Sequence, residues 1–122
     1  MDDNTAEFIS SLGCAEDALT IERNYFEAKA QSPFSTNAAG IDAMTYMTKL
    51  DAQLEQLENM IANTTVAARG GEFKALSEKR INEVRAATEA LGAALRTAAE
   101  LKAVVLAASD FLGVVGPIAK QV

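Results

Sequence analysis

The stretch MTKLDAQLEQLENMIANTTVAARGG, residues 47–71, carries the clearest pattern in the chain. Large apolar residues recur in it at alternating spacings of three and four, which is typical of a seam along one side of an α-helix. Charged and amide side chains fill most of the other positions. Two glycines then end the stretch, which indicates a helix stop with a left-handed C-terminal cap. The seam consists of Met47, Leu50, Leu54, Leu57 and Ile61.

Apolar patterns on both sides of this stretch predict two more helices. Pro33 disfavours helix in the residue before it, and the Ser and Thr that follow can cap a new helix. We therefore expect helices over about residues 5–30, 38–68 and 72–112. Asn4 or Thr5 is the expected cap of the first helix, and Gly13 leaves open its division into two.

The first and the third predicted helix each have an apolar face of their own. On the first helix, Ile9, Ile21 and Tyr25 widen the face, whose central residues are Phe8, Leu12, Ala15, Leu19 and Phe26. Gly92 interrupts the third helix among small residues, and we attribute it to close approach of another helix. The seam of the third helix is Val84, Ala87, Leu91, Ala94, Ala98, Leu101, Val105, Ala108 and Leu112.

Folding back at Gly70-Gly71 predicts a register for the second and third helices. Facing residues then have numbers that sum to about 141, so Leu57 meets Val84 and Leu50 meets Leu91. The same register brings Glu55 near Arg85 and Glu58 near Lys79 or Arg80. The predicted fold is all-α: one domain over residues 1–122, a three-helix up-down-up bundle built on this long, coiled-coil-like antiparallel hairpin.

The composition excludes most kinds of active site. The chain has no histidine, which removes the commonest general base and metal ligand, and a single cysteine, Cys14. We expect Cys14 to be a small buried hydrophobe, with a reactive or intermolecularly paired thiol as the alternative. Asp51, Glu55 and Glu58 are better explained as a solvated face than as metal ligands. We therefore predict no enzyme activity, no metal, no cofactor and no small-molecule substrate.

The charge is unevenly divided along the chain. Residues 1–63 hold eleven acidic and three basic side chains, a net of −8, whereas residues 64–122 hold six and eight, a net of +2. The overall charge of −6 disfavours nucleic-acid binding. The acidic N-terminus is unlike a secretory signal, so we expect a cytoplasmic protein or one exported by a specialised secretion system.

The segment 101–119 is more apolar than the outside of a three-helix bundle requires. Its apolar residues cover more than one face of a helix, which is typical of a contact surface for another subunit or partner unless the chain itself covers it. Gly113, Gly116 and Pro117 predict that helix ends before them. The candidate interaction residues are Val104, Leu106, Phe111, Leu112, Val114, Val115 and Ile118.

Three further residues lie off the seam of the second helix. We expect Met44, Tyr46 and Met60 to meet the first helix, with an adaptable partner surface as the alternative.

Together these features favour a non-enzymatic protein that acts through protein–protein contacts, as a self-associating or assembly subunit of the bacterial secretion or phage type. One alternative is a membrane-active helical hairpin, such as a toxin component or translocation factor. Another is a small acidic inhibitor or immunity protein that covers a basic target.

Overall fold

The computed structural model describes residues 2–30 and 37–120, and the side chains of 2–28 and 45–120. The described chain is all helix and connecting turns, so the predicted all-α class is confirmed. It has four helices where the sequence predicted three. They are α1 (Asp3–Ala30), α2 (Asn37–Arg69), α3 (Glu78–Thr97) and α4 (Leu101–Lys120).

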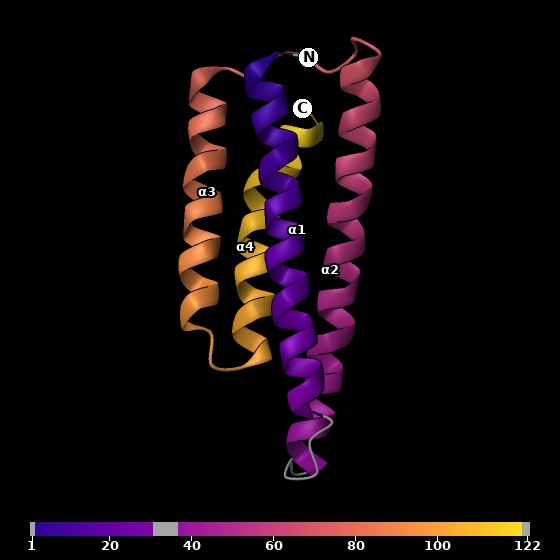
Figure 1. Cartoon of the computed structure of the whole chain (residues 1–122), viewed down its shortest axis with the longest axis vertical. Coiled ribbons are helices and arrows are strands. Elements are labelled where there is room, and N and C mark those ends of the chain that lie inside the picture. The colour runs from indigo at the N-terminus through magenta and orange to yellow at the C-terminus, as the bar shows by residue number, and fades with distance from the viewer. Residues whose placement is uncertain (1, 31–36, 121–122) are drawn as a thin grey trace.

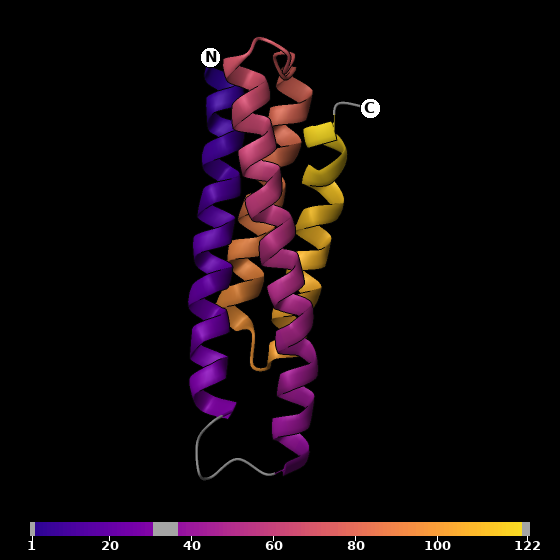
Figure 2. The same cartoon turned by 90° about the vertical axis from the view of Figure 1, so that its right-hand side faces the viewer.

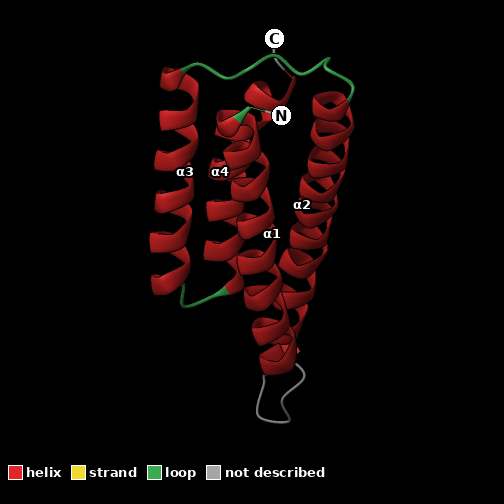
Figure 3. Cartoon of the chain, turned by 45° about the horizontal axis from the view of Figure 1, so that its top comes forward, coloured by secondary structure: helices red, strands yellow, loops and turns green. Residues whose placement is uncertain are grey.

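The four helices form an elongated bundle in which each runs opposite to the one before it (Figure 1). α1 packs against α2 and α3, and α4 packs against the same two helices. α1 and α4 also touch each other, so these two lie between α2 and α3 (Figure 3). α2 and α3 are consecutive in sequence, but their described parts do not contact each other. The connection between them therefore crosses the end of the bundle diagonally.

This diagonal placement corrects the predicted hairpin. Leu57 and Val84 are both fully buried, but they belong to helices on opposite sides of the core and do not form a two-helix seam. A heptad seam shows which side of a helix is apolar, and not which other helix will cover it. The predicted pairing and register of the second and third segments were therefore wrong.

The predicted end of the second helix is confirmed. Gly71 has φ +74°, the left-handed conformation that glycine adopts most readily. The amide of Glu72 donates to the carbonyl of Ala67 at 2.8 Å, and the amide of Gly71 donates to that of Ala68 at 3.2 Å. This pair of hydrogen bonds is the Schellman motif, which satisfies two carbonyls at the end of α2.

Residues 72–77, predicted to begin the third helix, instead cross the end of the bundle above α1 (Figures 1 and 3). The ring of Phe73 stacks on that of Phe8 with centroids 6.1 Å apart, and Leu76 is buried. The side chain of Asn4 donates to the carbonyl of Leu76 at 3.0 Å. Ser77 then caps α3, since its hydroxyl accepts from the amide of Arg80.

The predicted third helix is divided at residues 98–100. Ala98 has an extended backbone, with φ −68° and ψ 118°, and α4 begins at Leu101. No glycine or proline marks this break. A continuous helix would carry Val104, Phe111 and Val115 beyond their partners, whereas the turn brings all three into the core. Burial of apolar side chains thus outweighs local helix propensity here.

Two further expectations about helix ends were wrong. α4 continues through Gly113, Gly116 and Pro117 to Lys120, because its buried face is held by the other helices. α1 begins at Asp3, two residues earlier than expected, and it is continuous through Gly13, where the sequence had left a division open. A carboxylate oxygen of Asp2 accepts from the amide of Thr5 at 3.1 Å. Asp2 is therefore the cap, and the Thr5 hydroxyl, which also donates to it, lowers the pKa of its carboxyl.

The core runs along all four helices. The five residues predicted to centre the face of α1 are all buried, from Phe8 to Phe26. Gly92, attributed to close helix approach, has open space around it, since an added Cβ would meet no atom within 4 Å. The fully buried large side chains include Phe8, Leu12, Leu19, Leu50, Leu57, Ile81, Val84, Val104, Phe111 and Val115.

α1 and α2 extend beyond the turn between α3 and α4 (Figures 1 and 2). Glu7 pairs with Arg85 on the parallel helix α3, so Thr97 is level with about residue 19 of α1. Gln53 bonds to Val105 on the parallel helix α4, so α4 begins level with about residue 49 of α2. We call the remainder, residues 20–30 and 37–48, the projecting end.

Candidate functional site

The seven candidate interaction residues all lie on α4, but the structure divides them into two groups. Leu106 and Val114 are exposed, at 56% and 37%. The other five face the inside of the bundle and are buried by this chain: Val104, Phe111, Leu112, Val115 and Ile118.

The position of α4 explains its excess of apolar residues. A helix on the outside of a three-helix bundle buries one stripe, whereas α4 packs against α2, α3 and α1. The buried arc of α4 is correspondingly wide. The surface that α4 offers to a partner is limited to its outer side, where Leu106 and Val114 lie beside Lys102 and Asp110.

α4 also meets the length and composition required of a membrane-spanning helix. It has 20 residues and a mean hydropathy of 1.7, and 44% of the span is buried within the bundle. The core helix of a water-soluble bundle can have the same properties, so this feature is weak support for a membrane role.

The largest exposed apolar side chains of α1 lie at or beside the projecting end. Ile21 is 68% exposed and Tyr25 is 59% exposed, although both were expected to widen the buried face. Cys14 lies seven residues, or about two helical turns, before Ile21. It is exposed as a free thiol, so its predicted burial was wrong. The three residues form one stripe, since spacings of seven and four keep side chains on one side of a helix.

The stripe lies on the side of α1 next to α3, at the outer edge of their contact, since Cys14 is exposed although α3 still runs beside it. Tyr25 follows Glu7 by eighteen residues, which is five helical turns, so both point in nearly the same direction. The Glu7 carboxylate reaches Arg85 on α3 with two hydrogen bonds of 2.6 and 2.8 Å. Because α3 ends level with about residue 19, Ile21 and Tyr25 face a place where no further turn of α3 lies. The sequence alone could not reveal this, because it depends on where α3 ends.

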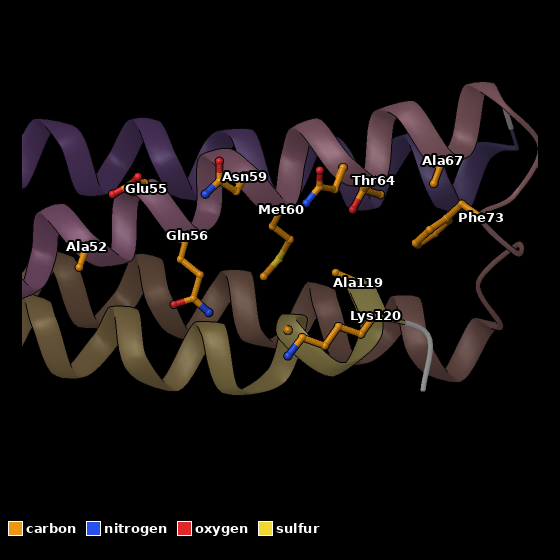
Figure 4. Close-up of a pocket in the computed structure, with 12 residues that line it drawn as sticks. Ala52, Glu55, Gln56, Asn59, Met60, Thr64, Ala67, Phe73, Ala119 and Lys120 are labelled. Atoms are coloured by element: carbon orange, nitrogen blue, oxygen red, sulfur yellow. The ribbon is translucent and has the colours of Figure 1, made fainter.

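A groove of about 610 Å³ lies between α2 and the C-terminal half of α4, at the opposite end of the bundle. Figure 4 shows Met60 and Phe73 turned into it, with Ala67 and Ala119 beside them. Met60 thus faces α4, whereas the sequence predicted contact with the first helix. Of the other two such residues, Tyr46 packs against the core and the side chain of Met44 lies outside the described residues.

Polar side chains surround the other part of the groove. Gln56 and Asn59 line it from α2, and Lys120 lines it from α4 (Figure 4). Asn63, between Met60 and Ala67 on α2, also lines the groove. Within the described part of the chain, Lys120 forms no ion pair. A second crevice between α3 and α4 has only about 140 Å³. The groove was not predicted, because it depends on how α4 is placed beside α2.

The ion pairs of the described residues lie on the surface. Arg85 lowers the pKa of Glu7 by hydrogen bonding, and Asp51 raises the pKa of Arg23 in the same way. Arg85 therefore pairs with Glu7 in place of the predicted Glu55. Such exposed pairs guide register more than they stabilise the fold.

Glu16 is the described carboxyl whose pKa is raised. Partial burial is the main cause, and the charges of Glu58 and Asp17 add to it. Glu16 on α1 is thus near an acidic residue of α2, so the contact between these helices includes repulsion.

The described residues include no group of three or more Cys, Asp or Glu side chains arranged to hold a metal ion. Ser10, Ser11 and Cys14 have no neighbouring histidine to activate them, because the chain contains none. No protein-family model matches the chain, and neither a curated protein nor a solved structure was found to be similar to it.

Proposed function

We propose that this chain is a non-enzymatic helical protein that acts through protein–protein contacts and associates with itself through the projecting end. The observation that carries the proposal is the exposure of Ile21 and Tyr25, at 68% and 59%, beside a place that α3 leaves empty. Large apolar side chains that gather on one helix side are typical of a contact surface.

A second copy of the chain fits this place because the projecting end is itself two helices wide. Two copies placed end to end, with their projecting ends overlapping antiparallel, would each supply the helices that the other lacks. The overlap would continue the four-helix bundle from one copy into the next. Such a two-fold arrangement uses the same surface on both copies, so the contact closes at a dimer.

The size of the overlap predicts a weak dimer. The projecting end has about eleven residues of α1, which is roughly 16 Å of helix. Contacts of this extent bury less surface than stable complexes do. We therefore expect dissociation in the micromolar range or weaker, and an equilibrium that shifts with protein concentration.

Sedimentation equilibrium across a concentration series tests this proposal. The wild-type chain should form dimers as its concentration rises, and Ile21→Lys should weaken association at least tenfold by placing a charge in the contact. Val66→Lys is the matched control, since Val66 is 72% exposed on α2 and outside the projecting end. A strict monomer, or equal effects of the two substitutions, would contradict the proposal.

A membrane-active protein is the second candidate function, and the length and hydropathy of α4 favour it. In the folded bundle most of its apolar surface is covered, so membrane insertion requires α4 to leave the other helices. Flotation with anionic and neutral liposomes, at pH 7 and pH 4.5, tests this. Failure to bind under every condition would remove this candidate and leave the first one unaffected.

A further inference from the structure

The groove between α2 and α4 is suited to a small ligand. Its volume of about 610 Å³ lies within the range of ordinary small-molecule sites, roughly 300–1,000 Å³. Gly116 forms part of its wall and is buried, yet an added Cβ there would meet no atom within 4 Å. The groove is therefore open down to the backbone of α4.

The walls of the groove differ in chemistry along its length. Met60, Ala67, Ala119 and the ring of Phe73 surround one part (Figure 4), which Asn63 and Thr64 also line from α2. Burying a hydrocarbon chain against such a wall removes apolar surface from water, which is favourable, and the flexible thioether of methionine adapts to the shape of the chain.

The other part of the groove offers hydrogen-bond donors and a positive charge. The side-chain amide of Gln56 points towards α4 and can donate, and it forms no hydrogen bond with another described residue (Figure 4). The ammonium group of Lys120 lies on the α4 side of the groove (Figure 4). Glu55 also lines the groove, at the far polar end, where it would repel an anion. An anionic group is thus favoured beside Lys120.

We propose that this groove binds a free medium-chain fatty acid. Its hydrocarbon tail lies between Met60 and Phe73, and its carboxylate pairs with Lys120 and accepts from the side-chain amide of Gln56 (Figure 4). From Met60 to Ala67 is seven residues of helix, roughly 10 Å, which suits a tail of medium length. The fatty acid is a ligand and not a substrate, because the groove contains no group that could react with it.

Isothermal titration with decanoate below its micelle concentration tests this site on the full chain. We expect saturable binding of one decanoate per chain. Lys120→Gln should weaken decanoate binding at least fivefold and leave the binding of decanol, which has the same tail without the charge, unchanged. Decanol bound as tightly as decanoate would overturn the assignment of the carboxylate to Lys120.

Two variants that fill the groove test its location. Gly116→Leu and Ala119→Leu each place a side chain in the space for the tail, so both should abolish binding. Circular dichroism shows which of them remains folded, and a folded one that binds normally would overturn the proposal.

Ile21→Ser is the matched control, because it removes an exposed apolar side chain of the projecting end. Loss of decanoate binding in this variant would show non-specific adsorption and would equally overturn the site. Its effect on dimer formation is measured separately, so failure of this site and failure of the proposed self-association are distinguishable.

Discussion

The turns before and after α3 have different physical causes. Before α3, Gly70 and Gly71 close α2 with a left-handed residue and two backbone hydrogen bonds. After α3, residues 98–100 turn without glycine or proline, and α4 begins at once. The first turn is set by the backbone preferences of its own residues. The second exists because the residues after it are apolar and need to be buried.

This difference gives the two turns different sensitivities. A turn made by local chemistry should respond to changes at the turn itself. A turn made by burial should tolerate changes at the turn and respond to changes in the core far from it. Each prediction below tests one part of this contrast.

The largest effect is expected in the core of α4. Phe111→Ala removes a side chain that is 2% exposed and should lower the free energy of unfolding by about 3–5 kcal/mol, measured by urea denaturation. Leu106→Ala is the control on the same helix, where 56% exposure predicts a change of about 0.5 kcal/mol or less. Equal losses would mean that α4 is not held in the core.

Proline substitutions just before and just after the C-terminal end of α3 should differ in their cost, because one lies in a helix and the other in a turn. Ala93→Pro, in the exposed interior of α3, should cost about 3 kcal/mol or more through a lost hydrogen bond and a steric clash. Ala99→Pro should cost less than about 1 kcal/mol, because Ala98 already has the extended backbone that proline requires before it. Thermal unfolding measures both. A severe loss at residue 99 would indicate that α3 and α4 form one continuous helix.

Adding a single methyl group at Gly71, in the turn after α2, should lower the free energy of unfolding. Gly71→Ala forces a side chain into a left-handed conformation and should cost about 1 kcal/mol in urea denaturation. Gly70→Ala is the neighbouring control, since its Cβ would make ordinary contacts, the nearest at 3.4 Å to the carbonyl of Val66. A change at residue 70 as large as that at residue 71 would argue against the Schellman motif.

The smallest effect is expected for the charge of Glu16, which the tertiary structure places near Glu58 of α2. Burial and the nearby acids raise the pKa of Glu16, so its ionised form destabilises the fold above that pKa. Glu16→Gln should therefore stabilise the chain slightly at pH 7. This gain should disappear as the pH falls through the raised pKa towards the ordinary value of 4.5, because Glu16 is then protonated in both states. Thermal unfolding at pH 7 and pH 3.5 measures this, and a gain that persists at pH 3.5 would contradict it.

The candidate site was predictable only in part. The sequence correctly marked 101–119 as unusually apolar, but this property reflects burial against three helices as well as any contact with a partner. Ile21 and Tyr25 became candidates only through the length of α3. The groove depends on the placement of α4, and Met60 and Phe73 come together there from segments that periodicity treats separately.

By itself, the sequence determined the helical class, the end of α2 at Gly71 and the buried face of α1. These features follow from backbone preference and from apolar spacing along one helix, which are properties of neighbouring residues. Only the tertiary structure decided that the last segment turns back at residues 98–100 and that α2 and α3 lie diagonally. The physical reason is that any helix that covers an apolar stripe can bury it. Which helix packs against which therefore depends on how the apolar stripes of all four helices are buried together.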